Sequence, residues 1–362
     1  MNDMVVFLGM IKTLEPVIIN DKYNRGGFFR SLPYIPSSTI SGALISNYFR
    51  ENKIEGDLYE NITQRYVWLS HAFPWDEEKS VRLNIADPLP LPLTTLARFR
   101  IKEDKEKKEE KYVSTAILAA EIIDKVLLKD YRIKNFKNLD FKVGTLFLSN
   151  KGFQRPYILD VYTHVSLNFK SRVSKMVRNK EKRGFLYTTE NIPIGKTFIF
   201  KGFVDKNIYD WMKKEAKIKI GSHRNKGYGE VEVKVLEKMN IDKYREERRR
   251  SIEVYGEYKY TVLDVVTYAS PQFLEDKLGS PIYQRSKRSC FKTWLNEEFY
   301  IYRNIVTTGS VFVYRNKKSV DEYVKLETTP PGNAISRLHG LNMIFFNNPI
   351  HFERWGEIIG KS

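Results

Sequence analysis

Residues 218–233 read Ile-Lys-Ile-Gly-Ser-His-Arg-Asn-Lys-Gly-Tyr-Gly-Glu-Val-Glu-Val. From Glu230 to Val235, valines alternate with charged residues, which is typical of a β-strand with one buried face. The glycines ahead of this strand allow the backbone to turn tightly and to approach a ligand closely. The stretch therefore predicts a glycine-rich loop that leads directly into a strand.

This glycine loop is also cationic. Arg224 and Lys226 place positive charge where the backbone is exposed, which suits a polyanion. The alternative is a plain β-turn with solvated charges. The candidate binding residues of the loop are Gly221, Ser222, His223, Arg224, Asn225, Lys226, Gly227, Tyr228 and Gly229.

Composition narrows the choice of partner. The chain has 362 residues, enough for two domains, and a hydrophobic fraction of 42%, which is typical of a globular protein. Its 61 Lys and Arg residues exceed 44 Asp and Glu residues, so the net charge is +17. An excess of this size favours an acidic partner, and nucleic acid is the usual one.

Several classes of protein are not expected. No apolar run approaches the roughly 20 residues that span a bilayer, and residues 1–12 lack the basic start of a signal peptide. The single cysteine, Cys290, leaves no disulfide framework and no multi-cysteine zinc site. We therefore expect a cytoplasmic protein without a membrane partner, a metal or a cofactor.

The order of expected elements indicates an α+β fold. A strand within 5–19 precedes a helix that Ser37 or Ser38 can cap, and a second strand follows at 65–73. Residues 93–160 are interpreted as an insertion. Further strands at 164–169 and 197–204, a helix at 207–216, the glycine loop and its strand complete a βαββαβ ferredoxin-like module over residues 1–240.

Residues 241–362 predict a second, degenerate copy of this module. The basic run 243–250 is interpreted as the boundary. Strands are expected at 258–266, 299–306, 310–314 and 341–346, with a possible helix at 289–296.

A second cationic segment lies at 170–183. It predicts a basic arm, and the alternative is a solvated, poorly ordered loop. Its candidate nucleic-acid-binding residues are Lys170, Arg172, Lys175, Arg178, Lys180, Lys182 and Arg183.

Several separate stretches resemble motifs of the RAMP superfamily, the RNA-recognition-like proteins of CRISPR effector complexes. Residues 35–44 resemble the family's Ile-Pro-Gly-Ser-Ser-Leu-Lys-Gly-Ala-Leu helix start, with Ser37 in place of the usual glycine. Arg224-Asn225-Lys226-Gly227-Tyr228-Gly229 resembles its glycine loop. The other similar stretches are 71–74 with 88–92, 164–190, and Val306-Thr307-Thr308-Gly309-Ser310-Val311, the last resembling a turn of a two-module type III-D subunit.

This resemblance implies two RNA-recognition-like folds and a place in a multisubunit ribonucleoprotein. The implied partners are CRISPR RNA, other RAMP subunits, the large polymerase-like subunit and, through the assembled complex, target RNA. The type III-D likeness implies a non-catalytic subunit that caps the repeat-derived 5′ handle of the guide. Ser37 and Ser38, at the helix start, are added to the candidate RNA-binding residues.

Residues 226–231 also resemble the aromatic motif of RNA-recognition domains. Glu230, however, occupies the position where that motif carries a stacking aromatic ring. We therefore expect the loop to contact phosphate or sugar, and we do not expect bases to stack on this strand.

The main alternative is a RAMP endoribonuclease, either a backbone subunit that cleaves target RNA or an enzyme that processes guide precursors. Metal-free RNA cleavage needs a base for the 2′-hydroxyl and an acid for the leaving oxygen. None of the five histidines, including His223, forms a recognisable pair by spacing. Asp21 lies where target-cleaving members carry their aspartate, but its surroundings match poorly, and a capping role is favoured for this carboxylate. A protein-only scaffold is the third alternative, and the charge excess argues against it.

Overall fold

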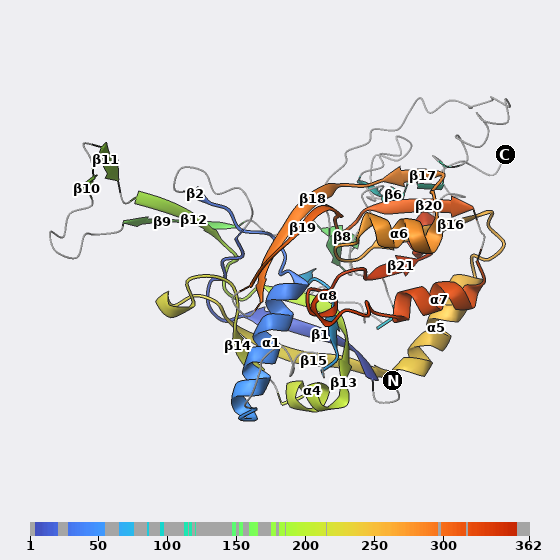
Figure 1. Ribbon diagram of the computed structural model, residues 1–362, viewed down its shortest axis with the longest axis horizontal. Helices are drawn as coiled ribbons and strands as arrows, with labels where there is room; N and C mark the ends of the chain where they lie inside the picture. Colours follow the sequence, from blue (N-terminus) through green and yellow to red (C-terminus); the bar gives the residue numbers. More distant parts are fainter. Residues whose placement is uncertain are drawn as a thin grey trace, which may run out of the picture.

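The computed structural model describes residues 4–20, 28–54, 65–75, 85–86, 95–97, 112–114, 116–117, 120, 147–149, 152–154, 159–165, 175–178, 181–184, 186–214, 216–295, 298–315 and 318–352 (Figure 1). Over these residues the fold is mixed α/β, and its sheets are mainly antiparallel. Residues 88–92, part of one stretch that resembles RAMP motifs, lie outside this range. Among the described helices, none is long and apolar enough to cross a membrane.

The first sheet has six strands, and every pairing in it is antiparallel. The strands lie in the order β14-β15-β1-β13-β3, with β4 also paired to β13. They are β1 (Met4–Thr13), β3 (Val67–Leu69), β4 (Phe73–Trp75), β13 (Thr197–Asp205), β14 (Ala216–Lys219) and β15 (Glu230–Asn240).

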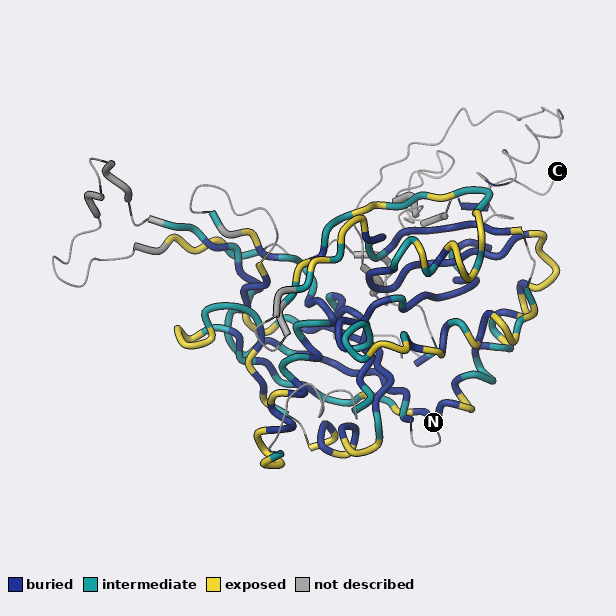
Figure 2. The backbone as a smooth tube through the Cα atoms, viewed as in Figure 1, coloured by how far each residue is buried: buried dark blue, intermediate teal, exposed yellow. Residues whose placement is uncertain are grey.

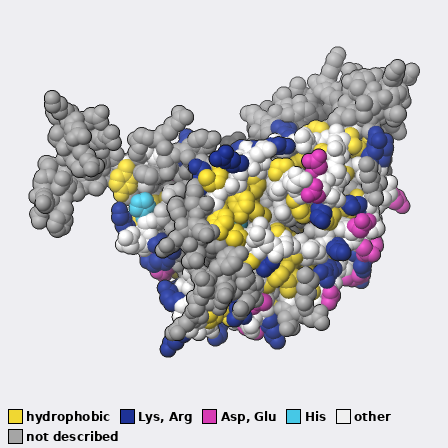
Figure 3. All heavy atoms as spheres, in the orientation of Figure 1, with side chains coloured by type: hydrophobic (Ala, Val, Ile, Leu, Met, Phe, Trp, Pro, Cys, Tyr) yellow, Lys and Arg dark blue, Asp and Glu magenta, His cyan; other side chains and the backbone are white. Residues whose placement is uncertain are grey.

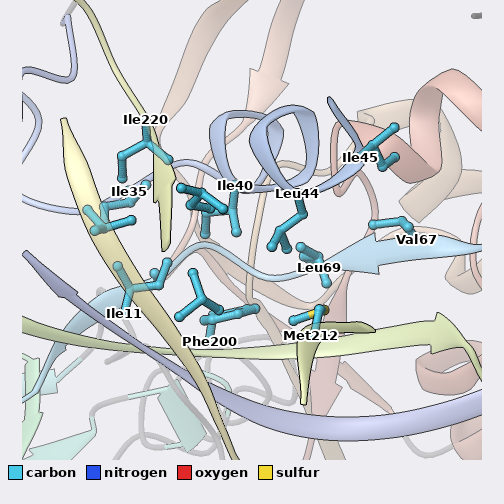
Figure 4. Close-up of a cluster of buried hydrophobic side chains, with 14 of the residues drawn as sticks. Ile11, Ile35, Ile40, Leu44, Ile45, Val67, Leu69, Phe200, Met212 and Ile220 are labelled. Carbon is cyan, nitrogen blue, oxygen red and sulfur yellow. The ribbon is translucent and has the colours of Figure 1, made fainter. Parts of the chain in front are cut away.

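Consecutive residues of the central strands β1 and β13 are buried (Figure 2). Since consecutive side chains of a strand point to opposite faces, both faces of this sheet are covered. One face packs against α1 (Ser37–Glu51) and α4 (Lys206–Met212) (Figure 4). The other face carries Val6 and Phe203, and it packs against Phe345 from the far end of the chain. The two halves of the chain therefore share a core.

Contacts around Ser37 replace the cap that the sequence predicts. The N-cap of α1 is Pro36, and no side chain caps this helix. The Ser37 hydroxyl is fully buried and donates to the carbonyl oxygen of His339 over 2.8 Å. Gly340 follows with φ +66°, and a Cβ there would lie 2.4 Å from the Leu69 carbonyl oxygen. The predicted capping role of Ser37 is wrong because its hydroxyl joins the two halves of the chain.

The second sheet has the order β17-β20-β16-β21 and is also antiparallel. Taken in chain order, its four strands lie in the same relative places as β1, β3, β13 and β15 of the first sheet. A long hairpin of two strands leaves between β17 and β20 (Figure 1). The elements are β16 (Tyr260–Val265), α6 (Pro271–Leu278), β17 (Tyr283–Arg285), β18 (Arg288–Leu295), β19 (Glu298–Val306), β20 (Val311–Arg315), α7 (Val320–Thr328), α8 (Ala334–Leu338) and β21 (Ile344–Phe346).

One sequence prediction in this half is wrong. The sequence predicts a possible helix at 289–296, but the described part of this range, residues 289–295, lies in strand β18. Phe291 is buried while Lys292 is exposed, and Thr293 pairs with Tyr300 of β19. Aromatic and β-branched residues with this alternation favour a strand once a partner strand is available.

The basic run 243–250 lies within helix α5 (Ile241–Glu253), which connects the two sheets. Asn240 caps the helix by accepting a hydrogen bond from the amide of Asp242 over 2.8 Å. Arg248 points inward and is buried, whereas Arg250 stays exposed. One cation of the run 243–250, Arg248, is therefore part of the core.

A ribbon projects from the first sheet (Figure 1). Its strands β9 (Asp160–Val165) and β12 (Leu186–Asn191) are antiparallel, and β2 (Phe28–Phe29) adds to β12 in parallel. The hairpin of β10 (Lys175–Arg178) and β11 (Glu181–Gly184) lies beyond the ribbon. Short pairs β5 (Thr95–Ala97) with β6 (Tyr112–Ser114), and β7 (Phe147–Ser149) with β8 (Gly152–Gln154), lie within the expected insertion.

Candidate nucleic-acid interface

The glycine loop 221–229 is built on left-handed backbone conformations. Gly221, Gly227 and Gly229 have φ values of +76°, +79° and +93°. A Cβ on Gly229 would lie 2.2 Å from the carbonyl oxygen of Ile220, which leaves no room for a side chain. Between these glycines, η2 (Arg224–Lys226) forms a single 3₁₀ turn. The loop is therefore a preformed turn that holds its polar residues outward.

The segment 16–18 joins the loop to the ribbon. On one edge, the amide of Gly229 donates to the Pro16 carbonyl, and the amide of Ser222 donates to the Ile18 carbonyl, both over 3.0 Å. On the opposite edge, Val17 and Ile192 exchange two backbone hydrogen bonds of 3.0 and 2.8 Å. Ile192 directly follows β12, so one short segment fixes the loop beside the base of the ribbon.

The charged residues of the loop face solvent. Arg224, Asn225 and Lys226 are exposed, and Figure 2 colours part of the loop as exposed residues. Within the part of the chain that the structure describes, neither Arg224 nor Lys226 forms an ion pair. Both cations are therefore available to an anion from solution, and the backbone around them is already ordered.

Tyr228 lies close to two tyrosines of the ribbon. Partial burial raises the pKa of Tyr228, and the neighbouring phenols of Tyr162 and Tyr187 raise this pKa further. The rings of Tyr228 and His223 are 6.2 Å apart. Tyr162 and Tyr187 are not among the residues predicted from the sequence, because their proximity to the loop depends on the 16–18 segment. Alternation in residues 160–165 was the available signal, since it places every second side chain on one face.

The other predicted residues lie on elements apart from the glycine loop or outside the described residues. Lys175 and Arg178 lie on β10, and Lys182 and Arg183 lie on β11, in a hairpin apart from the body of the molecule (Figure 1). Ser38 is half-buried on the first turn of α1. Four predicted residues lie outside the described residues: Asp21, Lys170, Arg172 and Lys180.

Three of the five histidines are core residues. Burial lowers the pKa of His71 to about 3 and that of His339 to about 4. His351 is buried, and its Nε2 lies 2.9 Å from Oδ1 of Asp264. No group of three or more His, Cys, Asp or Glu side chains is arranged to hold a metal ion among the described residues.

Replacement of Gly229 by alanine is expected to destabilise the chain by about 2 kcal/mol or more, because strain at positive φ adds to a clash with Ile220. The matched control is Gly227→Ala, where φ is also positive but no atom lies within 4 Å of the added Cβ. The control should lose only about 1 kcal/mol. Urea unfolding measures both variants, and equal losses would contradict the close approach at Gly229.

A family model of the RAMP superfamily matches residues 10–232. This range covers more than half of the 362-residue chain and contains the ribbon, the 16–18 segment and the glycine loop. The chain belongs to the RAMP superfamily. The second sheet lies beyond the matched range.

Solved structures show weaker similarity. A chain of the cryo-EM structure of the Type III-B Cmr-beta bound to cognate target RNA is 12% identical, with 84% of this chain and 86% of that chain covered and a TM-score of 0.41. A crystal structure of oligomeric Cmr4 from Pyrococcus furiosus is 13% identical, with 64% and 98% covered and a TM-score of 0.27. No curated protein matches the chain. Membership of the superfamily therefore rests on the family model.

Proposed function

We propose that this chain is a non-catalytic RNA-binding subunit of a type III CRISPR effector ribonucleoprotein. The subtype we favour is III-D, where the chain would hold the repeat-derived 5′ handle of the guide. The observation that carries this proposal is the exposed cationic turn at Arg224 and Lys226, held rigidly beside a projecting ribbon in a RAMP-superfamily chain.

The proposal includes two ferredoxin-like modules, residues 1–240 and 241–362. In the first sheet β15 pairs with β1, β1 with β13, and β13 with β3. In the second sheet β21 pairs with β16, β16 with β20, and β20 with β17. In each half, one helix follows the first strand and another follows the third. This is the strand order of a βαββαβ module, and it supports a duplicated fold.

The proposed partners are CRISPR RNA, other RAMP subunits and the large polymerase-like subunit, with target RNA reached through the assembled complex in the cytoplasm. The geometry favours contact between the glycine loop and the phosphate backbone of RNA. Two exposed cations next to an ordered turn can neutralise phosphates without reading base edges. The basic arm 170–183 would add a second phosphate contact.

The double variant Arg224→Ala/Lys226→Ala is expected to flatten the dependence of log K on log salt by about 1.4, since each phosphate neutralised on single-stranded RNA contributes about 0.7. Filter binding over a range of salt concentrations measures this slope. Lys213→Ala/Lys214→Ala is the matched control, because both lysines are exposed and lie after α4. An unchanged slope in the loop variant would refute phosphate contact there.

A triple alanine variant at Arg172, Lys175 and Arg178 in the basic arm should flatten the same slope by about 1–2.

Purification of the chain from its native host, with sequencing of the bound RNA, tests the function itself. The expected result is guide RNA with a common repeat-derived 5′ end. Unrelated RNA, or no RNA, would count against the handle-binding role. Cleavage of target RNA by the assembled complex that disappears in Asp21→Ala would establish the endoribonuclease alternative instead.

A further inference from the structure

Three tyrosines from separate parts of the chain gather next to the cationic turn. Tyr162 comes from β9, Tyr187 from β12 and Tyr228 from the glycine loop. Backbone hydrogen bonds from the 16–18 segment to the loop on one side and to Ile192 on the other hold Tyr228 beside the ribbon. In agreement with this placement, the phenols of Tyr162 and Tyr187 raise the pKa of Tyr228, after the larger effect of burial. Phosphate contact by the loop does not require any of these rings.

Strand register shows that the two ribbon tyrosines share a face. Tyr162 lies opposite Thr189, and Tyr187 lies opposite His164. Directly opposed residues of an antiparallel pair project on the same side, as do residues two apart on one strand. Tyr162 and Tyr187 are therefore diagonal neighbours on one face of the ribbon, and Tyr228 approaches them from the loop.

This aromatic face is accessible from solvent. The side chain of Tyr162 is 39% exposed, and Tyr187 and Tyr228 are half-buried. Figure 3 shows hydrophobic and histidine side chains beside Lys and Arg side chains at the end of the molecule where the ribbon leaves. The 16–18 segment is hydrogen-bonded both to the glycine loop and to Ile192 next to β12, so the cluster is ordered before any ligand arrives.

The charge around the cluster selects its occupant. Arg224 and Lys226 are exposed next to Tyr228, so a ligand here should combine an anionic backbone with flat rings. Single-stranded RNA has both, because its bases can leave the stack and lie on aromatic side chains. Bases of a duplex remain stacked on each other and would not reach the rings.

We propose that Tyr162, Tyr187 and Tyr228 form a stacking platform for one or two bases of a single-stranded RNA whose phosphates contact Arg224 and Lys226. The platform rests on the proposed function for the source of the RNA, but not for its chemistry. This platform lies at a different place from the stacking strand of RNA-recognition domains. In this chain Glu230 of β15 occupies the position of their stacking aromatic ring, whereas the ribbon carries tyrosines on the opposite side of the 16–18 segment.

The test uses the full chain and a short single-stranded oligoadenylate in which 2-aminopurine replaces one adenine. Stacking on an aromatic ring quenches 2-aminopurine fluorescence, so binding of the wild-type chain should quench the signal. The variant Tyr162→Ala/Tyr187→Ala should lose most of the quenching and bind about 5- to 150-fold more weakly for each base unstacked. Its salt slope should stay at the wild-type value, because no cation is removed.

Two controls separate stacking from folding. Tyr162→Phe/Tyr187→Phe keeps the rings and should restore both quenching and affinity. Tyr258→Ala removes a tyrosine that is 44% exposed in the second half, and it should change neither quantity. Competition by unlabelled guide RNA and by unlabelled target RNA then shows which strand occupies the platform in the complex.

Each failure has a different meaning. RNA binding with wild-type affinity and quenching in the alanine variant would overturn the platform and leave the proposed function intact. Equal weakening in the phenylalanine and alanine variants would also overturn it, because the rings would then not be responsible. No binding of RNA by the wild-type chain at low salt would overturn both proposals.

Discussion

Replacement of Arg248 by methionine is expected to destabilise the chain by about 3–5 kcal/mol, because it leaves the Glu327 carboxylate buried without its counter-charge. Both side chains of this ion pair are 1% exposed. Arg248 donates to Glu327 from Nε over 2.8 Å and from Nη2 over 2.9 Å. Nη2 also donates to the Phe346 carbonyl over 2.7 Å, so the guanidinium links α5, α7 and β21.

Urea unfolding of the single and double variants tests this expectation. Arg248→Met/Glu327→Leu removes both charges and should recover most of the lost stability, as buried ion pairs replaced by apolar residues often do. Arg250→Met is the surface control. Its ion pair with Glu246 is exposed, so it should cost at most about 1 kcal/mol. A single Arg248 variant with the wild-type midpoint would show that the pair contributes nothing to folding.

Lowering the pH from 7 to 5 is expected to reduce the free energy of unfolding by about 2 kcal/mol through His71 alone. Burial lowers the pKa of His71 from 6.5 to about 3, so its folded form stays neutral while the unfolded form gains a proton. The unfolded chain thus binds more protons between pH 6.5 and about 3, and stability falls as pH falls through this window. His339, with a pKa of about 4, acts in the same direction.

His71→Asn separates this effect from the titration of other groups. The asparagine oxygen can accept the Ser37 amide hydrogen bond that Nδ1 of His71 accepts over 3.0 Å. The variant should lose about 1.4 kcal/mol less stability per pH unit over the window, which corresponds to one proton. Chemical unfolding at several pH values measures this slope. Equal slopes in the variant and the wild type would mean that His71 does not titrate on unfolding.

Local periodicity was sufficient to predict several elements. The alternation of valines after Gly229 predicted β15, and the run 197–204 matches β13 within one residue. The sequence analysis predicted none of the helices α5, α6, α7 and α8 that the structure describes in the second half, although two of them carry local signals. Ser319 and Glu322 form a capping box at the start of α7, and Pro271 occupies the first turn of α6.

Other features depend on tertiary contacts, which a linear reading does not contain. Nothing in the run 243–250 distinguishes Arg248 from its exposed neighbours until α7 brings Glu327 opposite it. The hydroxyl of Ser37 could cap a helix equally well, but the approach of His339 uses it for a different bond. Similarly, the loop was found from its glycines, whereas Tyr162 and Tyr187 reach it only through the pairing of Val17 with Ile192.

The core shared between the halves limits how this chain can change over time. Val266, Met343 and Phe345 complete the face of the first sheet that Val6 and Phe203 present. The Nε1 of Trp68 donates to the Leu341 carbonyl over 3.0 Å across the same junction. Either half alone would expose a sheet face that the other half covers, so substitutions at this junction must be compatible with both halves.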